Sequence, residues 1–391
     1  MRIEAVDFFY LSMPEVTTDA DGSQDALLVR VAAGGLVGFG ECEASPLPSI
    51  AAFVCPMSHG ACRPVGASVL GEPIDDAADI ARIAARVAYD SMDLLQAAHT
   101  WSGVEMALWD LLGKARGEPV WKLLGYTRSA PKTPYASQLF GATPEETLRL
   151  GREQRQAGFR AVKFGWGPVG RGSVEADADH FVAAREGIGA DGILLVDVGQ
   201  VFGEDVDAAE ARLPALEAAR ATWFEEPFAG HAFEAYAELA RRSPKVALAG
   251  GEAAHNPFMA RHLIDFGKVG FVQVDCGRIG GIGPAKAVAD HAVAKGVTYV
   301  NHTFTSHLAL SASLQPFAGL ERHEICEYPA RPREVATAFV ATQLERDGDG
   351  CLAAPDAPGL GIEIDPAGVR RFLVETEIVV GGRVLYRTPT I

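Results

Sequence analysis

From about Pro134 onward, short apolar runs alternate with longer segments of helical pattern. Eight runs follow this rhythm: YASQL, AVKFG, ILLVDVG, TWFEEP, VALAGGE, FVQVDC, TYVNHT and EICEYP. Strands that alternate with helices are typical of parallel pairing, and eight such units are enough to close a (β/α) barrel. Thr143-Pro144 supports this interpretation, since Thr is a good helix N-cap and Pro is favoured in the first turn. The pattern predicts a barrel over residues 131–355.

The segments on either side of the barrel follow other patterns. Residues 26–43 form two β-rich runs around Gly34-Gly35, which predicts a β-hairpin. Residues 45–66 are interrupted by prolines and glycines, so we expect a mobile loop without regular structure. Helical pattern follows from about residue 73 to 117. The opening domain, residues 1–130, is therefore α+β, and we expect residues 356–391, which the barrel does not need, to return to it.

Composition and charge narrow the class of protein. Of 391 residues, 48% are hydrophobic and 22% charged, which is ordinary for a folded globular chain. A net charge of -16 repels polyphosphate, so we expect no nucleic-acid partner. No run approaches the roughly 20 apolar residues of a membrane span, and the N-terminus lacks the order of a signal peptide. We therefore expect a cytoplasmic protein with no membrane association. We also expect a homo-oligomer.

Polar residues stand at or near the ends of the apolar runs. Successive members of this set are 23 to 34 residues apart, about one strand plus one helix. Because all strands of a parallel barrel open on the same face at their C-terminal ends, we expect these side chains to converge in one mouth. The set consists of Lys163, Asp197, Glu225, Glu252, Asp275, His302 and Glu327.

Three consecutive members of the set are carboxylates: Asp197, Glu225 and Glu252. Held close together they would repel one another unless a cation lay between them. Ligation by oxygen alone favours Mg²⁺, with Mn²⁺ possible, over Zn²⁺. Any one of these acids taken singly could instead be a solvated loop residue or a helix cap. Three carboxylates at corresponding strand ends, however, predict a metal site.

The next two members form a candidate acid/base pair. A carboxylate at Asp275 on the strand before His302 would hold the imidazole in one tautomer and raise its basicity. His307 is a competing candidate, but it lies five residues further on, where the next helix is expected. Lys163 is interpreted as a charge that orients a substrate carboxylate; the alternative is an ordinary lysine with its ammonium in solvent.

Two other motifs are weaker. Gly281-Ile-Gly283 follows a strand and opens a helix, but Lys286 stands where a dinucleotide fingerprint needs its third Gly. Asp347-Gly-Asp-Gly350 lacks the spacing of a calcium loop, and Pro358 stands where the bidentate Glu belongs. We expect no nucleotide site at the first motif and a turn at the second.

The motifs together resemble the enolase superfamily, in its mandelate racemase and muconate-lactonising branch. GFGECE, VEMALWDLLGKARGEPVWKLLG, FRAVKFG, LLVDVG, WFEEP, LAGGE, VQVDCGRIGGI and PGLGIEI occur in the family's order. The resemblance implies a (β/α)7β modified TIM barrel with an α+β capping domain built from both termini. It also implies Mg²⁺ on Asp197, Glu225 and Glu252, His302 with Asp275 as acid/base, and Glu327 in contact with the intermediate.

Two positions depart from the family's pattern. Where its racemases carry Lys-x-Lys, this chain has Lys163-Phe164-Gly165, so the second lysine is absent. Gly199 stands where relatives often carry Asn or His. With one base, the simplest outcome of proton abstraction next to a carboxylate is loss of a β-hydroxyl, with His302 returning the proton. The first hypothesis is thus a Mg²⁺-dependent acid-sugar (aldonate or aldarate) dehydratase that forms a 2-keto-3-deoxy acid.

Alternatives remain open. A racemase, epimerase or cycloisomerase of a small carboxylate is one, and a non-catalytic barrel that binds metal and an acid ligand is another. Specificity is expected in the capping loops, residues 17–24 and 45–66, where Glu43 or His59 would reach the ligand.

Overall fold

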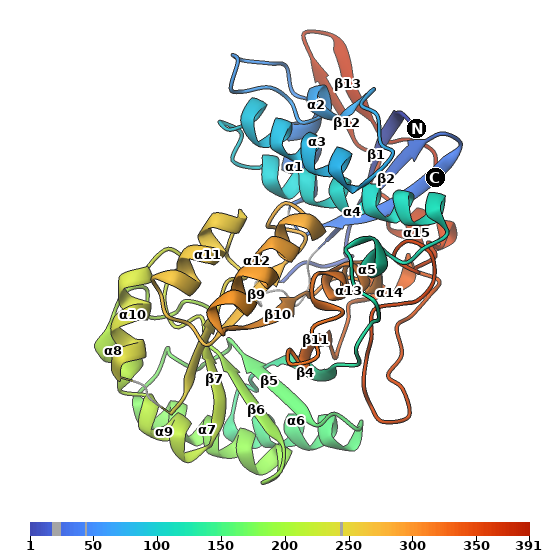
Figure 1. Cartoon of the computed structure of the whole chain (residues 1–391). Coiled ribbons are helices and arrows are strands. Elements are labelled where there is room, and N and C mark those ends of the chain that lie inside the picture. The colour runs from blue at the N-terminus through green and yellow to red at the C-terminus, as the bar shows by residue number, and fades with distance from the viewer. Residues whose placement is uncertain (18–24, 44, 243–244) are drawn as a thin grey trace.

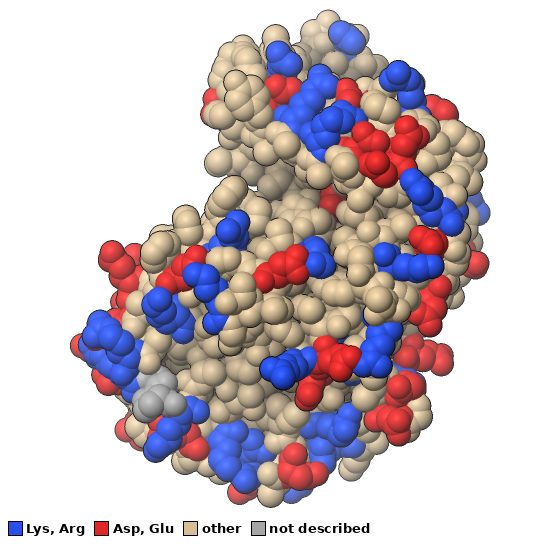
Figure 2. Space-filling model, in the orientation of Figure 1, with Lys and Arg blue, Asp and Glu red and all other residues tan. Residues whose placement is uncertain are grey.

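The computed structural model describes residues 1–17, 25–43, 45–242 and 245–391, and two regions are visible in Figure 1. The larger region is a barrel of parallel strands surrounded by helices. The smaller region lies at one end of it and combines the first part of the chain with a hairpin from the C-terminal end (Figure 1). On the face drawn in Figure 2, acidic and basic side chains are interspersed, and a hollow separates the two regions.

The barrel confirms all eight predicted strands. In chain order they are β4 (Thr133–Leu139), β5 (Ala161–Gly165), β6 (Ile193–Asp197), β7 (Ala221–Glu225), β8 (Ala247–Gly250), β9 (Phe271–Asp275), β10 (Thr298–His302) and β11 (Ile325–Pro329). Along the sheet the strands follow the order β10, β9, β8, β7, β6, β5, β4 and β11. The remaining seam, between β10 and β11, is bridged by a side chain. Asn301 accepts a hydrogen bond from the Glu327 N–H at 2.8 Å and donates one to the Glu327 carbonyl at 3.4 Å.

Helices connect successive strands, as the alternating pattern predicts. They are α6 (Pro144–Gln156), α7 (Val174–Ile188), α8 (Val206–Glu210), α9 (Leu213–Ala218), α10 (Phe233–Arg242), α11 (Pro257–Asp265), α12 (Ile282–Lys295) and α13 (His307–Leu314). Thr143 caps α6 as predicted, because its hydroxyl accepts from the Glu146 N–H and so satisfies an exposed backbone donor. His307 is the first residue of α13, also as predicted.

The smaller region is an antiparallel sheet covered by helices. Its strands are β1 (Ile3–Leu11), β2 (Ala26–Ala33) and β3 (Leu36–Cys42), and its helices are α1 (Pro46–Val54), α2 (Gly66–Val69), α3 (Ala77–Asp90), α4 (Ala97–Arg116) and α5 (Val120–Leu123). The predicted hairpin over residues 26–43 is confirmed as β2 and β3. The predicted helical stretch is two helices, α3 and α4, with a break over residues 91–96.

The expectation of an irregular loop over residues 45–66 is wrong at its start, where α1 is a regular helix. Its two prolines, Pro46 and Pro48, lie in the first turn, where backbone N–H groups have no partner within a helix in any case. Ile50 and Phe53 of α1 are buried in the core. The predicted specificity segment 17–24 lies, from residue 18 on, outside the described residues.

The C-terminal residues add α14 (Glu334–Ala338), α15 (Pro366–Phe372) and the hairpin β12 (Glu377–Val380) and β13 (Arg383–Arg387). The Val374 N–H donates to the Tyr10 carbonyl at 2.8 Å, and the Tyr386 hydroxyl donates to the Phe8 carbonyl. The end of the chain thus packs on β1. The predicted fold class, a (β/α)7β barrel with an α+β cap built from both termini, is confirmed. None of the described helices is both long and apolar enough to cross a membrane.

Helix α4 joins the cap to the barrel through a buried carboxylate. Glu105 accepts hydrogen bonds from the N–H groups of Ile282 and Gly283, at 2.7 and 2.8 Å, and from the Trp109 indole at 2.7 Å. Gly281 has φ +107°, and a Cβ there would lie 2.1 Å from a Glu105 oxygen. The GxG motif therefore receives a carboxylate of the protein itself at the N-terminus of α12.

Candidate active site

The site lies on an apolar layer inside the barrel. Inward-facing side chains from six of the eight barrel strands fill this layer, and they are Tyr135, Ala161, Leu195, Trp223, Ala249 and Val300. In a strand, residues two apart point to the same face. Two positions further along these strands, the inward-facing residues become polar. They include Ser137, Lys163, Asp197, Glu225 and His302. The alternation of side chains along each strand thus points these polar residues into the barrel, where they form one ring.

The three predicted metal ligands come together. One carboxylate oxygen each from Asp197, Glu225 and Glu252 lies within 4.8 Å of the others, and all three side chains are buried. Asp197 and Glu225 end β6 and β7, which are paired in register at these two residues. Glu252 comes two residues after β8. Oxygen-only donors at this spacing could hold a hard divalent cation such as Mg²⁺ and leave positions for substrate and water.

Burial and mutual repulsion both act on these acids. Burial raises the pKa of Asp197 well above its ordinary value, and the Glu225 carboxylate raises it further. Burial also raises the pKa of Glu225, against the opposing effect of Lys163. Glu252 behaves differently: burial acts to raise its pKa, but His302 and Arg278 together hold the pKa well below its usual range. Burial and mutual repulsion thus disfavour the ionised forms of Asp197 and Glu225, and a bound cation would offset both effects.

Lys163 supplies part of that balance. Its Nζ lies 2.8 Å from a Glu225 oxygen, 3.1 Å from Glu327 and 3.5 Å from Asp197, and the side chain is 1% exposed. Burial lowers its pKa, but Glu225 and Glu327 outweigh that effect and raise the pKa well above the ordinary value. Lys163 is therefore a fixed positive charge beside the metal ligands. This placement suits an electrostatic role toward an anionic substrate group.

His302 and Asp275 form the expected pair. His302 Nδ1 lies 2.7 Å from Asp275 Oδ2, and the other Asp275 oxygen accepts from the Gly277 N–H at 2.6 Å. The Asp275 carboxylate is thereby held in place, and it holds the ring with Nε2 pointing to the site. Nε2 lies 2.9 Å from a Glu252 oxygen, at the edge of the carboxylate cluster. The neighbouring Glu327 accepts from the Thr303 N–H at 2.6 Å.

The competing histidine has another partner. His307 Nδ1 accepts a hydrogen bond from the Leu344 N–H at 2.6 Å, and its ring packs against Tyr328 at 5.7 Å between centroids. Burial lowers the pKa of His307 to about 4, so the ring is neutral near pH 7. These contacts give His307 a structural role in the packing of α13.

A tryptophan explains one of the two departures from the family's pattern. Trp166 has φ +54°, a left-handed backbone conformation that is rare for a bulky residue. A Cβ at Gly199, whose φ is +52°, would lie 2.5 Å from the Trp166 ring. The indole thus occupies the space that a side chain at 199 would need. A Cβ at Gly165 would lie 3.1 Å from an Asp197 oxygen. No motif in the sequence indicated Trp166.

Glu226 and Gln200, also unselected from the sequence, position the Glu252 segment. One Glu226 oxygen accepts from the N–H groups of Gly251 and Ala253 at 3.1 and 3.4 Å, on either side of Glu252. The other accepts from the Gln200 amide at 2.6 Å. Both residues have positive φ, 41° and 64°, and such strain is concentrated at functional sites. The Glu-Glu pair in TWFEEP is the one sequence signal that could have indicated Glu226.

The two candidate specificity residues lie in different surroundings. Glu43 pairs with Arg278 at 2.7 Å, and Arg278 also donates to the Glu252 carbonyl at 3.4 Å. Arg278 therefore links Glu43 to the carboxylate cluster. His59 lies 3.1 Å from Asp93 within the cap and is more than half exposed. Ligand contact by either residue stays a prediction.

This combination of a capped (β/α)7β barrel, a buried carboxylate cluster and a histidine-carboxylate pair defines a class of protein. Residues 12–125 match the mandelate racemase / muconate lactonizing enzyme N-terminal domain, and residues 146–368 match the enolase C-terminal domain-like family. The chain belongs to the enolase superfamily, in its mandelate racemase and muconate-lactonizing branch. The resemblance drawn from the sequence motifs is thereby confirmed.

Particular relatives span several reactions. The chain is 66% identical to a solved protein described as a predicted mandelate racemase from Rhodobacter sphaeroides, with a TM-score of 0.96 over 99% of both chains. It is 30% identical to 3,6-anhydro-alpha-L-galactonate cycloisomerase of Streptomyces coelicolor, over 70% of this chain and 72% of the relative. It is 28% identical to arabinonate dehydratase of Saccharolobus solfataricus, over 67% and 69% of the two chains.

Proposed function

We propose that this protein is a Mg²⁺-dependent acid-sugar dehydratase. The observation that carries the proposal is a one-sided site. The His302–Asp275 pair lies beside the carboxylate cluster and Lys163, whereas glycines occupy positions 165 and 199, where a second base would stand. Similarity to arabinonate dehydratase supports acid sugars as the substrate class.

The proposed roles follow from the contacts. His302 Nε2 removes the proton from the carbon next to the substrate carboxylate, with Asp275 holding the ring through Nδ1. Lys163 lies against the substrate carboxylate and balances charge that forms on it. Asp197, Glu225 and Glu252 hold the divalent cation, which when bound supplies further positive charge at that carboxylate. Glu327, fixed by the Thr303 N–H, contacts the reacting end of the substrate.

Elimination follows from the lack of a basic side chain at positions 165 and 199. A racemase must deliver a proton to the face opposite the one that lost it, and neither Gly165 nor Gly199 can do so. Once the proton has been removed, a hydroxyl on the β-carbon can leave as water if His302 returns its proton to that oxygen. The C–O bond breaks, the electron pair left at the α-carbon forms the double bond, and the enol becomes a 2-keto-3-deoxy acid.

A cycloisomerase is a second candidate, because a relative at 30% identity has that activity. In a 3,6-anhydro acid the ring oxygen is on the β-carbon, so the same proton removal would open the ring by expelling that oxygen. The machinery would be unchanged, and the product would keep the mass of the substrate instead of losing water.

A substrate screen in D₂O tests the proposal. Aldonic, aldaric and anhydro-aldonic acids are incubated with the protein and Mg²⁺, and products are identified by mass and by their 2-keto group. We expect a dehydrated keto acid, with recovered substrate retaining its configuration at C2. A keto acid formed without loss of water would instead support the cycloisomerase. A mixture of C2 epimers without keto acid would mean that a second base exists and would overturn the dehydratase.

A further inference from the structure

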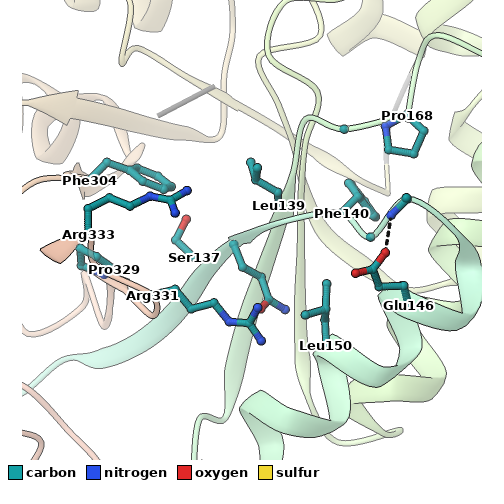
Figure 3. A pocket seen from close by; sticks show the side chains of 14 residues that line it. Ser137, Leu139, Phe140, Glu146, Leu150, Pro168, Phe304, Pro329, Arg331 and Arg333 are labelled. Carbon is teal, nitrogen blue, oxygen red and sulfur yellow. Dashed lines mark hydrogen bonds between the residues drawn. The ribbon is translucent and has the colours of Figure 1, made fainter. Parts of the chain in front are cut away.

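A cavity of about 680 Å³ lies beside the candidate active site and takes no part in the roles assigned above. It is bordered by the C-terminal ends of β4 and β11, the start of α6 and the segment after β5 (Figure 3). Its volume falls within the usual range of small-molecule sites, roughly 300 to 1,000 Å³. Leu139, Phe140 and Leu150 form much of its apolar wall, as Figure 3 shows.

This cavity continues from the catalytic centre. A second, smaller cavity of about 10 Å³ is lined by Lys163, Trp166 and Asp197. Both cavities share four lining residues, namely Ser137, Gln138, Leu139 and Phe304. The Phe304 ring lies 5.7 Å from the His302 ring and 5.8 Å from Lys163 Nζ. A molecule whose carboxylate lay at Lys163 would therefore extend past Phe304 into the larger cavity.

The charges on its wall are unequally balanced. Arg331 is paired with Glu153 at 2.6 Å, and Glu146 accepts from the Ala142 N–H at 2.9 Å. Arg333, at the start of α14, forms no side-chain hydrogen bond or ion pair with any described residue, and its guanidinium points into the cavity (Figure 3). In a chain of net charge -16, this cation without a partner faces the cavity rather than a neighbouring acid.

Buried polar groups give a second, independent indication of a ligand. The Ser137 hydroxyl, on a side chain 3% exposed, has no hydrogen-bond partner within the part of the chain that the structure describes, and Figure 3 shows it pointing into the same cavity. The Gln138 amide nitrogen, on a neighbouring lining residue, is also buried without a partner, although its oxygen accepts from Gln154 at 3.0 Å. Buried donors without partners are destabilising unless something polar satisfies them. The cavity is thus built for a polar occupant.

We infer that the acid-sugar substrate carries a second carboxylate, bound by Arg333 at the end remote from the reacting carbon. The guanidinium can hold a carboxylate through two parallel hydrogen bonds, and the hydroxyls between the two ends would meet Ser137 and Gln138. The inference rests on the proposed function and narrows it. It selects aldaric acids over aldonic acids of the same configuration.

Matched substrates and variants test the inference. Keto-acid formation is measured with Mg²⁺ for pairs of aldaric and aldonic acids and for a 6-phosphorylated aldonic acid. We expect the aldaric acid to have the lowest KM. Arg333→Met should raise that KM about 10- to 100-fold, the range of a lost charged hydrogen bond, and leave the KM for the aldonic acid unchanged. Arg370→Met, at an exposed arginine of α15, is the control and should change neither value.

Calorimetric titration of the His302→Asn protein separates binding from turnover. We expect aldaric acid to bind more tightly than aldonic acid, and Arg333→Met in this background to remove the difference. If binding behaves in this way but no acid sugar gives keto acid, the proposed function fails and the inference stands. Equal KM values for both acids, no effect of Arg333→Met, or preference for the phosphorylated acid would overturn the inference while leaving the dehydratase intact.

Discussion

Two groups of buried carboxylates in this molecule differ in how their charge is satisfied. On α4, Glu105 accepts three hydrogen bonds, and Asp110 accepts from the N–H groups of Phe39 and Leu360 and from Lys114. At the barrel mouth, Asp197, Glu225 and Glu252 face one another within 4.8 Å. Both groups are buried and accept hydrogen bonds, since Asp197 accepts from the Gly199 N–H and Glu225 from Lys163 and the Trp223 indole, but the mouth acids also face one another.

The difference separates a structural role from a functional one. Glu105 and Asp110 link segments that are far apart in the chain, because their backbone partners lie on β3, on α12 and at Leu360. Their hydrogen bonds are complete, so they need no ligand. Asp197 and Glu225 share Lys163, and Glu252 lies beside His302, but the three acids also repel one another, which favours binding of a cation. Removing a charge should therefore have opposite effects in the two places.

The largest expected effect is removal of the cation. A chelator should abolish turnover and lower the melting temperature, and Mg²⁺ should restore both, since ligand binding stabilises the folded state by mass action. Glu252→Gln removes one ligand charge and should greatly reduce the Mg²⁺-dependent shift in melting temperature. Full activity in chelator, or an unchanged shift in the Glu252→Gln protein, would contradict the metal site.

The next effect concerns the base. His302→Asn should lower kcat by about 10²- to 10⁴-fold, the usual contribution of a positioned general acid or base, while circular dichroism stays unchanged. His307→Asn is the matched control, because this second buried histidine hydrogen-bonds to the backbone of Leu344. If the control loses activity and His302→Asn keeps it, the assignment of the base is wrong.

Glu105→Gln sharpens the structural side of the comparison. An amide offers one acceptor oxygen and turns its NH₂ group toward backbone donors, so at least one buried N–H of α12 loses its partner. We expect the free energy of unfolding to fall by about 2 kcal/mol or more in urea titrations. Turnover per folded molecule should remain close to that of the unmodified protein, since Glu105 touches none of the proposed catalytic groups.

Asp197→Asn should act in the opposite direction on stability. In chelator, neutralising one of the mutually repelling acids should raise the free energy of unfolding by about 0.5 to 2 kcal/mol, a typical gain at a site that sacrifices stability for function. Urea titration with chelator measures this change. A loss of stability comparable to that of Glu105→Gln would mean that the mouth acids are as well satisfied as those on α4.

The smallest expected effect is a pH dependence of stability that arises where α4 contacts the barrel. His99 on α4 lies 2.8 Å from His255 on the segment after β8, and burial, followed by repulsion from His255 and Arg278, lowers the pKa of His99 to about 4. The folded state binds this proton less readily than the unfolded state, whose pKa is about 6.5. Stability should therefore fall as the pH drops from about 6.5 through 4, and His99→Gln should reduce that fall.

Local signals explain why much of the barrel was predictable. Each strand and helix carries its own apolar period, and the cap at Thr143 depends on neighbours three residues away. Parallel pairing then brings the strand ends to one face without further information, which is why Asp197 and His302 could be selected before their distances were known. Helix α1 was missed because Pro46 and Pro48 resemble loop punctuation, although both suit a first turn.

Periodicity along the chain was enough to predict the alternating strands and helices of the barrel, and it placed the polar residues at the strand ends. The tertiary structure alone decided which groups have partners. Glu226 and Arg278, which follow other strands, hydrogen-bond to backbone groups of the Glu252 segment. Trp166 fills the space over Gly199, and Arg333 points into a cavity instead of toward an acid. Such contacts depend on side-chain packing between segments far apart in the chain, and no local pattern specifies them.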